Sequence, residues 1–358
     1  MKFSTGAQLL AVAAAALVLT AGAQAERQVI RTTFLTQPAW SPDGKHVAWV
    51  AGPTNGYGTV WVADASGRRA RALHQFGHSP LDGVDEVGQI MWQTSSSLLV
   101  DAQLGGVVQL FRLTLRGQAT VLNQLSDLNF STDASRRLVA TTGYTSTCGH
   151  PNCPAPIHIL DTATRNVTAV GRPGELDLFP ALAPDGRHVA YGRAACPATN
   201  CGNAQGVWLA AWRNGTRRQI VRSGESPVWS PNGELIAYVK QGRHGSLLRV
   251  LRLGGRTRSV GSRFGGEPPV FSPDSRSLAY VAGYGRPSST HAGVAVVDLH
   301  THRNVRRAGT FALVDGRPTW SPDGTTLVVA ARTSRANCTS LWIAPVRSGA
   351  WRRFRSCG

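Results

Sequence analysis

Acidic residues recur in this sequence at a spacing that favours a shared binding site. The 358 residues include 20 Asp and Glu against 38 Lys and Arg, for a formal net charge of +18. Eight acids that stand a few residues before a recurring aromatic motif are candidate ligands: Asp85, Glu86, Asp127, Glu175, Asp177, Glu225, Glu267 and Asp315. Carboxylates gathered at one opening would attract a metal cation such as calcium or a basic peptide. The alternative is structural, because loop acids commonly cap backbone amides or pair with cations such as Arg172, Arg222 or Arg317.

No sequence motif places a nucleophile beside a base or assembles a metal site. The chain lacks G-x-S-x-G, H-E-x-x-H, an EF-hand loop and a Gly-rich phosphate loop ahead of a helix. The nearest approach to a catalytic cluster is HQFGHSPLDGVDE, from His74 to Glu86, but His residues on a polar loop are usually solvated. We therefore assign no catalytic residue, no metal ligand and no cofactor, and leave open only calcium at the acidic opening.

Six cysteines fall into three close groups, which favours local disulfides in an exported protein. The expected pairs are Cys148 with Cys153, Cys196 with Cys201, and Cys338 with Cys357. Four thiolates of the first two pairs, with His150 beside them, could instead bind zinc. The third pair has a geometric argument. In a hairpin centred near Arg347 and Ser348, two residues lie opposite each other when their numbers sum to about 695, as those of Cys338 and Cys357 do. The two cysteines are therefore expected to be cross-strand neighbours.

The elements that must position these residues come from a repeat. Five clear copies read PAWSPDG, PALAPDG, PVWSPNG, PVFSPDS and PTWSPDG, and two degenerate copies read IMWQTSSSLLV and LNFSTDASRRLVA. The reference residues are Trp40, Trp92, Phe130, Leu182, Trp229, Phe271 and Trp320. Their mean interval of about 47 residues is typical of a propeller blade.

Each copy predicts four strands. Strand A ends at the reference residue, S-P-D-G forms a tight turn, a short apolar strand B and a strand C follow, and a basic strand D closes the copy. The fold predicted is a single all-β propeller with seven blades that start near residues 37, 88, 127, 178, 226, 268 and 317; six blades, with copies 2 and 3 fused, is the alternative. We expect the tryptophans of strands A and C to pack between blades.

The P-x-W-S-P-D-G signature with its L-A-Y run resembles the TolB-like propellers of secreted and periplasmic bacterial proteins, which are related to WD-repeat proteins. The resemblance covers residues 30 to 357 and implies fold more strongly than function. It also implies a channel mouth that receives partner peptides. TolB itself has six blades behind a separate N-terminal domain, so its role in envelope maintenance is not carried over.

Strand A is the innermost strand of a propeller blade, so the acids that precede it would meet at the mouth of the central channel. The function expected is therefore a non-catalytic propeller that binds a protein, a peptide or a cationic ligand there. An enzyme, either a lyase or an oxidoreductase with its site at the channel mouth, is one alternative. A binder of anionic polymers, nucleic acid included, through the Arg-rich outer strands is the other.

Residues 1–25 are expected to be a cleaved signal peptide. Their single charge is Lys2, the run from Leu9 to Leu19 is apolar, and Ala23-Gln24-Ala25 matches a cleavage site. The propeller domain would then span residues 26–358, in the periplasm, the cell envelope or the secreted space. The segment QVIRTTF, from Gln28 to Phe34, could add an edge strand to the ring.

Overall fold

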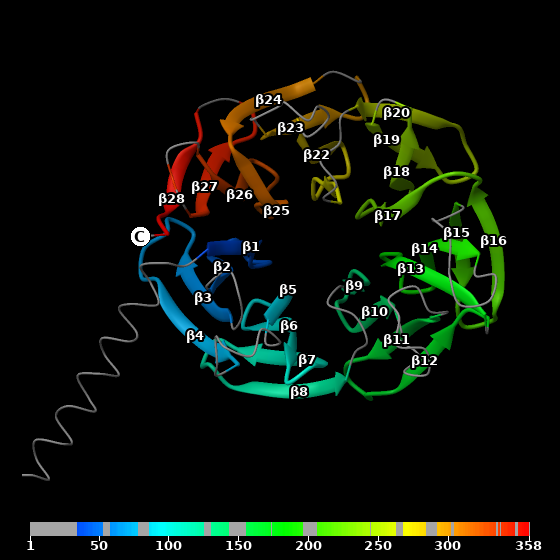
Figure 1. Cartoon of the computed structure of the whole chain (residues 1–358), viewed down its shortest axis with the longest axis horizontal. Coiled ribbons are helices and arrows are strands. Elements are labelled where there is room, and N and C mark those ends of the chain that lie inside the picture. Colours follow the sequence, from blue (N-terminus) through cyan, green and yellow to red (C-terminus); the bar gives the residue numbers. More distant parts are fainter. Residues whose placement is uncertain are drawn as a thin grey trace, which may run out of the picture.

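The computed structural model describes residues 34–52, 58–77, 86–124, 130–142, 155–172, 174–195, 206–243, 245–262, 268–283, 292–301, 304–333, 336, 338–347 and 350–357. Within these ranges, seven four-stranded antiparallel sheets form a closed ring around a central axis (Figure 1). The predicted seven-bladed propeller is confirmed, and the six-bladed alternative is wrong. No helix in the described part of the chain is long and apolar enough to cross a membrane.

Every blade uses four strands that are consecutive in the chain. Blades 1 to 3 contain β1 (Phe34–Trp40), β2 (His46–Gly52), β3 (Gly58–Asp64) and β4 (Arg71–Phe76); β5 (Glu86–Thr94), β6 (Ser97–Leu104), β7 (Val107–Thr114) and β8 (Ala119–Gln124); and β9 (Phe130–Thr132), β10 (Leu138–Thr142), β11 (Ile157–Asp161) and β12 (Val167–Val170). Blades 4 and 5 contain β13 (Glu175–Leu182), β14 (His188–Ala195), β15 (Val207–Ala211) and β16 (Thr216–Val221); and β17 (Glu225–Trp229), β18 (Leu235–Gly242), β19 (Gly245–Arg252) and β20 (Thr257–Ser262). Blades 6 and 7 contain β21 (Val270–Phe271), β22 (Ser277–Ala282), β23 (Ala292–Asp298) and β24 (Asn304–Phe311); and β25 (Leu313–Trp320), β26 (Thr326–Arg332), β27 (Ser340–Pro345) and β28 (Arg352–Arg355).

The turn after strand A is built by its own side chains. Ser41 Oγ donates to Asp43 Oδ1 at 2.6 Å and accepts the His46 N–H at 2.9 Å, while Gly44 takes a φ of 69° that a side chain would resist. The same Ser-to-acid bond recurs from Ser272 to Asp274 and from Ser321 to Asp323. These bonds fix the hairpin register of the copies that carry the serine. In PALAPDG, Ala183 keeps the backbone bonds alone, from its N–H to His188 O at 2.8 Å and from Gly186 N–H to its carbonyl at 2.9 Å.

Blade 3 differs from its predicted register by two residues. Trp40 pairs with Val47 in blade 1, whereas the equivalent Val139 pairs with Thr132 and not with Phe130. The Asp133 carboxylate takes the place of the serine hydroxyl and accepts the Leu138 N–H at 3.0 Å. A carboxylate and a hydroxyl both serve as acceptors in this turn, so the degenerate copy folds in the same way from a shifted sequence.

Tryptophan side chains connect neighbouring blades, as predicted. Trp92, Trp229 and Trp320 donate through Nε1 to the carbonyls of Ala39, Ala181 and Val270, at 2.9, 3.0 and 3.1 Å. Each acceptor directly precedes the reference residue of the preceding blade. The innermost strands are therefore joined by side-chain bonds as well as by apolar packing.

Among the described residues, the seam between blades 7 and 1 closes without exchange of a strand. Both blades consist of consecutive strands, and Leu35 N–H donates to Thr339 O at 3.2 Å across the seam. The predicted bond between Cys338 and Cys357 is present, with a Cα–Cα distance of 6.1 Å. The other two expected cysteine pairs, the expected signal peptide and the part of QVIRTTF before Phe34 lie outside the described residues.

Candidate functional site

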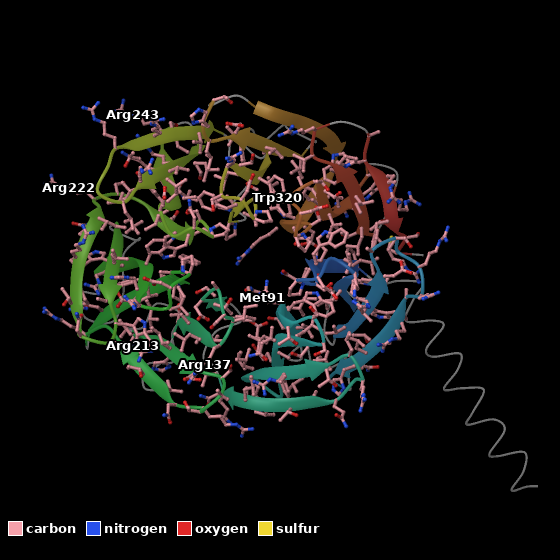
Figure 2. All side chains as sticks on the ribbon, turned by 180° about the vertical axis from the view of Figure 1, so that it is seen from behind. Met91, Arg137, Arg213, Arg222, Arg243 and Trp320 are labelled. Carbon is pink, nitrogen blue, oxygen red and sulfur yellow. A yellow bond between two sulfur atoms is a disulfide. The ribbon has the colours of Figure 1, made fainter. Side chains whose placement is uncertain are left out.

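A central pocket of about 1000 Å3 lies along the axis of the ring and receives residues from the innermost strand of all seven blades. Figure 2 shows Met91 and Trp320 beside this centre, while Arg213, Arg222 and Arg243 lie at the periphery. In most blades the lining runs from the middle of strand A to the turn that follows it. The pocket thus lies toward the opposite end of strand A from the acids selected in the sequence.

Proline forms much of the pocket wall, because the turn after strand A carries a proline in five blades and because strand A has a free edge. This edge has no further strand to accept its N–H groups, and proline has no N–H to leave unpaired. The prolines that line the pocket are Pro38, Pro42, Pro180, Pro184, Pro227, Pro231, Pro268, Pro273, Pro318 and Pro322. Their rings make the wall apolar and stiff.

A bulge in strand A turns selected side chains toward the pocket. The register shifts between Thr36 and Ala39 in β1 and at the same place in β13 and β17. The residue before proline at each bulge, Gln37, Phe179 or Ser226, has a φ between 50° and 52° and lines the pocket. Phe179 is 47% exposed, which is unusual for a large apolar side chain.

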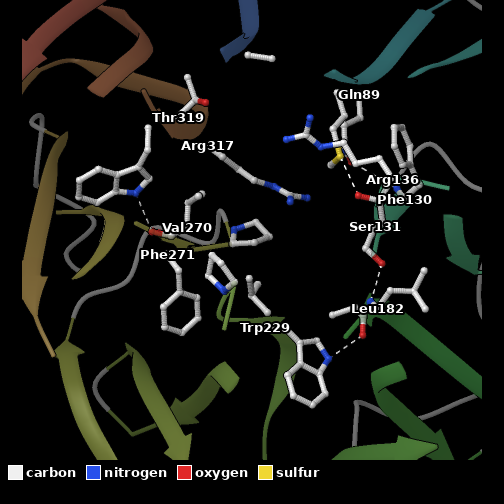
Figure 3. A pocket seen from close by; sticks show the side chains of 18 of the residues that line it. Gln89, Phe130, Ser131, Arg136, Leu182, Trp229, Val270, Phe271, Arg317 and Thr319 are labelled. Atoms are coloured by element: carbon white, nitrogen blue, oxygen red, sulfur yellow. Dashed lines mark hydrogen bonds between the residues drawn. The ribbon is translucent and has the colours of Figure 1, made fainter. Parts of the chain in front are cut away.

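Two arginines reach into the pocket. Figure 3 shows Arg136 from blade 3 and Arg317 from blade 7 extending from opposite walls toward the middle of the pocket. Burial lowers the pKa of Arg136. Neither arginine was selected from the sequence as a pocket residue. Two features of the sequence could have indicated them. Arg317 directly precedes a proline of strand A, and Arg136 stands at the turn position that glycine occupies in other copies.

The two carboxylates that line the pocket have internal partners. Asp133 caps its turn, as described above, and Glu225 Oε1 accepts a hydrogen bond from Gln241 Nε2 at 2.6 Å. The lining residues that the structure describes include no His, Cys, Lys or Tyr. The described residues also contain no group of three or more His, Cys, Asp or Glu that could hold a metal ion.

Asp177 and Glu175, two of the selected acids, meet arginines within blade 4. Asp177 is fully buried, and Arg193 Nε donates to its Oδ1 at 2.8 Å. Glu175 Oε2 lies 3.1 Å from Arg193 and 2.9 Å from Arg217. Burial raises the pKa of Asp177, and the hydrogen bonds from Arg193 oppose that shift. The partners are thus Arg193 and Arg217 and not Arg172, Arg222 or Arg317, but the acids pair with arginines, as the structural alternative expected.

The remaining selected acids are dispersed or not described. Glu86 is exposed at the start of β5, and Asp315 is partly buried in β25. Asp85, Asp127 and Glu267 lie outside the described residues. Among the selected acids that the structure describes, only Glu225 lines the pocket. Their joint role in binding stays a prediction.

The partly buried Asp315 should make the stability of the protein depend on pH. Burial raises the pKa of its carboxyl group above the range usual for aspartate. The folded protein then binds a proton more readily than the unfolded chain, so stability falls as the pH rises through the folded pKa. We expect Asp315→Asn to raise the melting temperature at pH 7 and to leave it unchanged at pH 3, measured by calorimetry. An equal effect at both pH values would contradict this.

Comparison with known proteins gives structural relatives only. No family model matches the chain, and no curated protein sequence does. Oligogalacturonate lyase from Vibrio parahaemolyticus superposes with a TM-score of 0.67 and 12% identity, over 87% of this chain and 91% of the lyase. TolB from Acinetobacter baumannii gives 0.51 and 14%, over 85% and 80%.

A prolyl endopeptidase gives a TM-score of 0.62 and 10% identity, over 91% of this chain and half of its own length. At such identities the likeness concerns the fold alone, which binding proteins and enzymes share. The chain is therefore a seven-bladed β-propeller with structural relatives that include TolB and a lyase.

Proposed function

We propose that this protein is an exported, non-catalytic propeller that binds an extended segment of a partner protein in its central pocket. The observation that carries the proposal is the pocket itself. Its volume is at the upper end of the range for ligand sites, about 300–1000 Å3. Its wall combines proline rings with the exposed Phe179, and such surfaces suit extended peptides.

The chemistry of the lining supports binding rather than catalysis. A general acid or base needs a titratable group that can reach the substrate. Of the described titratable lining groups, Asp133 and Glu225 accept hydrogen bonds within their own blades, and the other two are arginines, whose side chains keep their proton in proteins. The resemblance of the repeat signature to TolB-like propellers supports the same reading, because it implies a channel mouth that receives partner peptides.

Export is part of the proposal. The disulfide between Cys338 and Cys357 fits an oxidising compartment outside the cytoplasm. Residues 1–25 would be the signal peptide and residues 26–358 the mature propeller. N-terminal sequencing of the native protein should begin at Glu26, and an intact Met1 would contradict this.

Peptide binding can be tested through Phe179. A displayed library of random ten-residue peptides is selected against the protein, and the affinity of the enriched peptides is measured by fluorescence anisotropy. Phe179→Gly removes the ring and suits a φ of 52°, so the fold should persist. The loss of one buried aromatic contact should weaken binding at least about tenfold.

The matched control is Val121→Thr, which changes an exposed side chain on the outer strand β8. It should leave the affinity unchanged. Peptides that bind wild type and Phe179→Gly equally well would place the binding surface elsewhere. Turnover of a substrate lost on Phe179→Gly would instead favour the enzyme alternative.

A further inference from the structure

Arg136 occupies a backbone position that favours glycine. The equivalent turn residues Gly44, Gly186, Gly233 and Gly324 have φ values of 69°, 65°, 74° and 70°, and Arg136 has a φ of 56°. A side chain in this left-handed region is disfavoured relative to glycine. The turn uses only the backbone of Arg136, whose carbonyl accepts a bond from Gln93 Nε2 at 3.2 Å. The side chain is therefore not needed to form the turn.

The Arg136 guanidinium is partly withdrawn from water, and no described residue forms an ion pair or hydrogen bond with it. Burial is the cause of its lowered pKa, with no carboxylate acting in the opposite direction. The adjacent Arg137 differs, because its side chain is 56% exposed and lies 2.6 Å from Asp161. A desolvated cation without a counter-charge is unfavourable, and an anion in the pocket would offset that cost.

Arg317 supplies a second positive charge to the same pocket. It precedes Pro318 on β25 and extends toward the side from which Arg136 comes (Figure 3). Of the described carboxylates in the lining, Asp133 accepts a hydrogen bond from Leu138 N–H and Glu225 accepts one from Gln241. Two guanidinium groups facing one apolar space suit a single shared anion.

We propose that Arg136 and Arg317 form an anion site that binds a carboxylate of the partner peptide, either an acidic side chain or the C-terminus. The inference rests on the proposed function, because it names the group by which the peptide is recognised. Guanidinium groups bind carboxylates with two parallel hydrogen bonds, which adds orientation to charge. The pocket thus selects a ligand of the opposite charge to the one expected from the acidic residues of the sequence.

The first test uses glutarate, a small dicarboxylate, with binding followed by NMR of the arginine Nε–Hε signals. We expect saturable shifts of the Arg136 and Arg317 signals. Arg136→Gln and Arg317→Gln should each weaken binding at least tenfold, while Arg252→Gln, which removes one charge from a surface pair with Glu234, should not. Equal weakening in all three variants would indicate net charge alone and would overturn the site.

Arg136→Gly separates a recognition role from a structural one. This variant restores the residue that other turns use, so its melting temperature should equal or exceed that of the wild type while glutarate binding is lost. A lower melting temperature together with unchanged glutarate binding would assign Arg136 to the fold and overturn the proposal.

The second test identifies the source of the carboxylate and separates the two proposals. Peptides selected in the Phe179 experiment are compared as acid and glutamine analogues, and with free and amidated C-termini. Loss of binding in one neutral form supports the site and names the source. Pocket binding that is indifferent to all four forms overturns the anion inference but leaves the proposed function intact.

Two further outcomes distinguish the anion site from the peptide proposal. Glutarate binding that depends on both arginines, without any pocket-binding peptide, would support the anion site and contradict the proposed function. Binding of a galacturonate trisaccharide at least tenfold tighter than any peptide would overturn the peptide as the source of the carboxylate.

Discussion

Replacing Asp177 with alanine is expected to lower the free energy of unfolding by about 3–5 kcal/mol, because it leaves a buried arginine without its main counter-charge. Arg193 is 9% exposed at its side chain and donates two hydrogen bonds to the Asp177 carboxylate, at 2.8 and 3.2 Å. Its guanidinium also lies 4.5 Å from the ring centre of Trp208 and donates to Tyr191 Oη at 3.0 Å. Glu175 remains 3.1 Å away and offsets part of the charge, which favours the lower end of the range.

The same cluster joins two blades. Asp177 N–H donates to Ala155 O, and Ala155 N–H donates to Glu175 O, both at 3.0 Å, so β13 is tied to the segment that precedes β11. Loss of the ion pair should loosen this contact as well. We expect faster amide hydrogen exchange at Ala155 and at residue 177 in the Asp177→Ala variant.

The matched control removes both charges. Asp177→Val with Arg193→Met replaces the pair with apolar side chains of comparable size, and such replacements are often neutral or stabilising. Urea denaturation of the wild type and of both variants measures the effect. A loss below about 1 kcal/mol for Asp177→Ala would mean that water or Glu175 already neutralises Arg193.

The fold was predictable because turn chemistry repeats along the chain. S-P-D-G specifies both the hairpin and its register, since the serine, the acid and the glycine each have a separate role in the turn. Where those roles are taken by other residues, the prediction was less accurate. In blade 3, Asp133 replaces the serine, and the reference residue was placed two positions too early.

The arrangement of the acids was less predictable, because their distance from the turn does not say which partners they meet. Asp177 lies directly opposite Arg193 across the β13–β14 hairpin, beyond a bulge that shifts the pairing. A constant sum of residue numbers, the rule that placed Cys338 opposite Cys357, would have placed Asp177 opposite Ala194, because the bulge shifts the pairing by one residue. Pairing within a blade must therefore be examined before acids are assigned to a shared opening.

The pocket arginines were missed for a different reason. Their surroundings depend on which residues of strand A face the axis, and the bulge before each proline changes that orientation in a way that strict alternation does not predict. An arginine at a glycine position, such as Arg136, is visible in an aligned set of repeats only after the register of the degenerate copy is known.

Removing the disulfide between Cys338 and Cys357 is expected to lower the free energy of unfolding by about 3 kcal/mol, the value typical of a loop of this size. The two cysteines are 19 residues apart and connect the segment before β27 with the end of β28. Cys357 is 4% exposed and packs with Leu35, Trp49 and Val328 between blades 7 and 1. The bond therefore stabilises the last strand at the seam where the ring closes.

This seam has fewer other connections than a propeller closed by strand exchange would have. Each of the two blades is continuous in sequence, and the Nε1 of Trp40 is buried without the hydrogen bond that Trp92, Trp229 and Trp320 make to the preceding blade. Cys338→Ser with Cys357→Ser should consequently open the ring at this seam first. Hydrogen exchange should increase in β28 and β1 before it increases in blades 3 to 5, and the urea midpoint should fall.

Treatment with a reductant cannot replace the double variant, because it would also act on Cys148, Cys153, Cys196 and Cys201, which are expected to form two further disulfides. Those loops are much shorter, so the loop-entropy model assigns them a smaller effect. The matched control is therefore Cys148→Ser with Cys153→Ser. If this control and the Cys338–Cys357 variant lose equal stability, or if exchange increases uniformly around the ring, the bond acts on the unfolded chain generally. Exchange confined at first to β28 and β1 would instead establish that the ring is held closed by its C-terminal disulfide and the packing around Cys357.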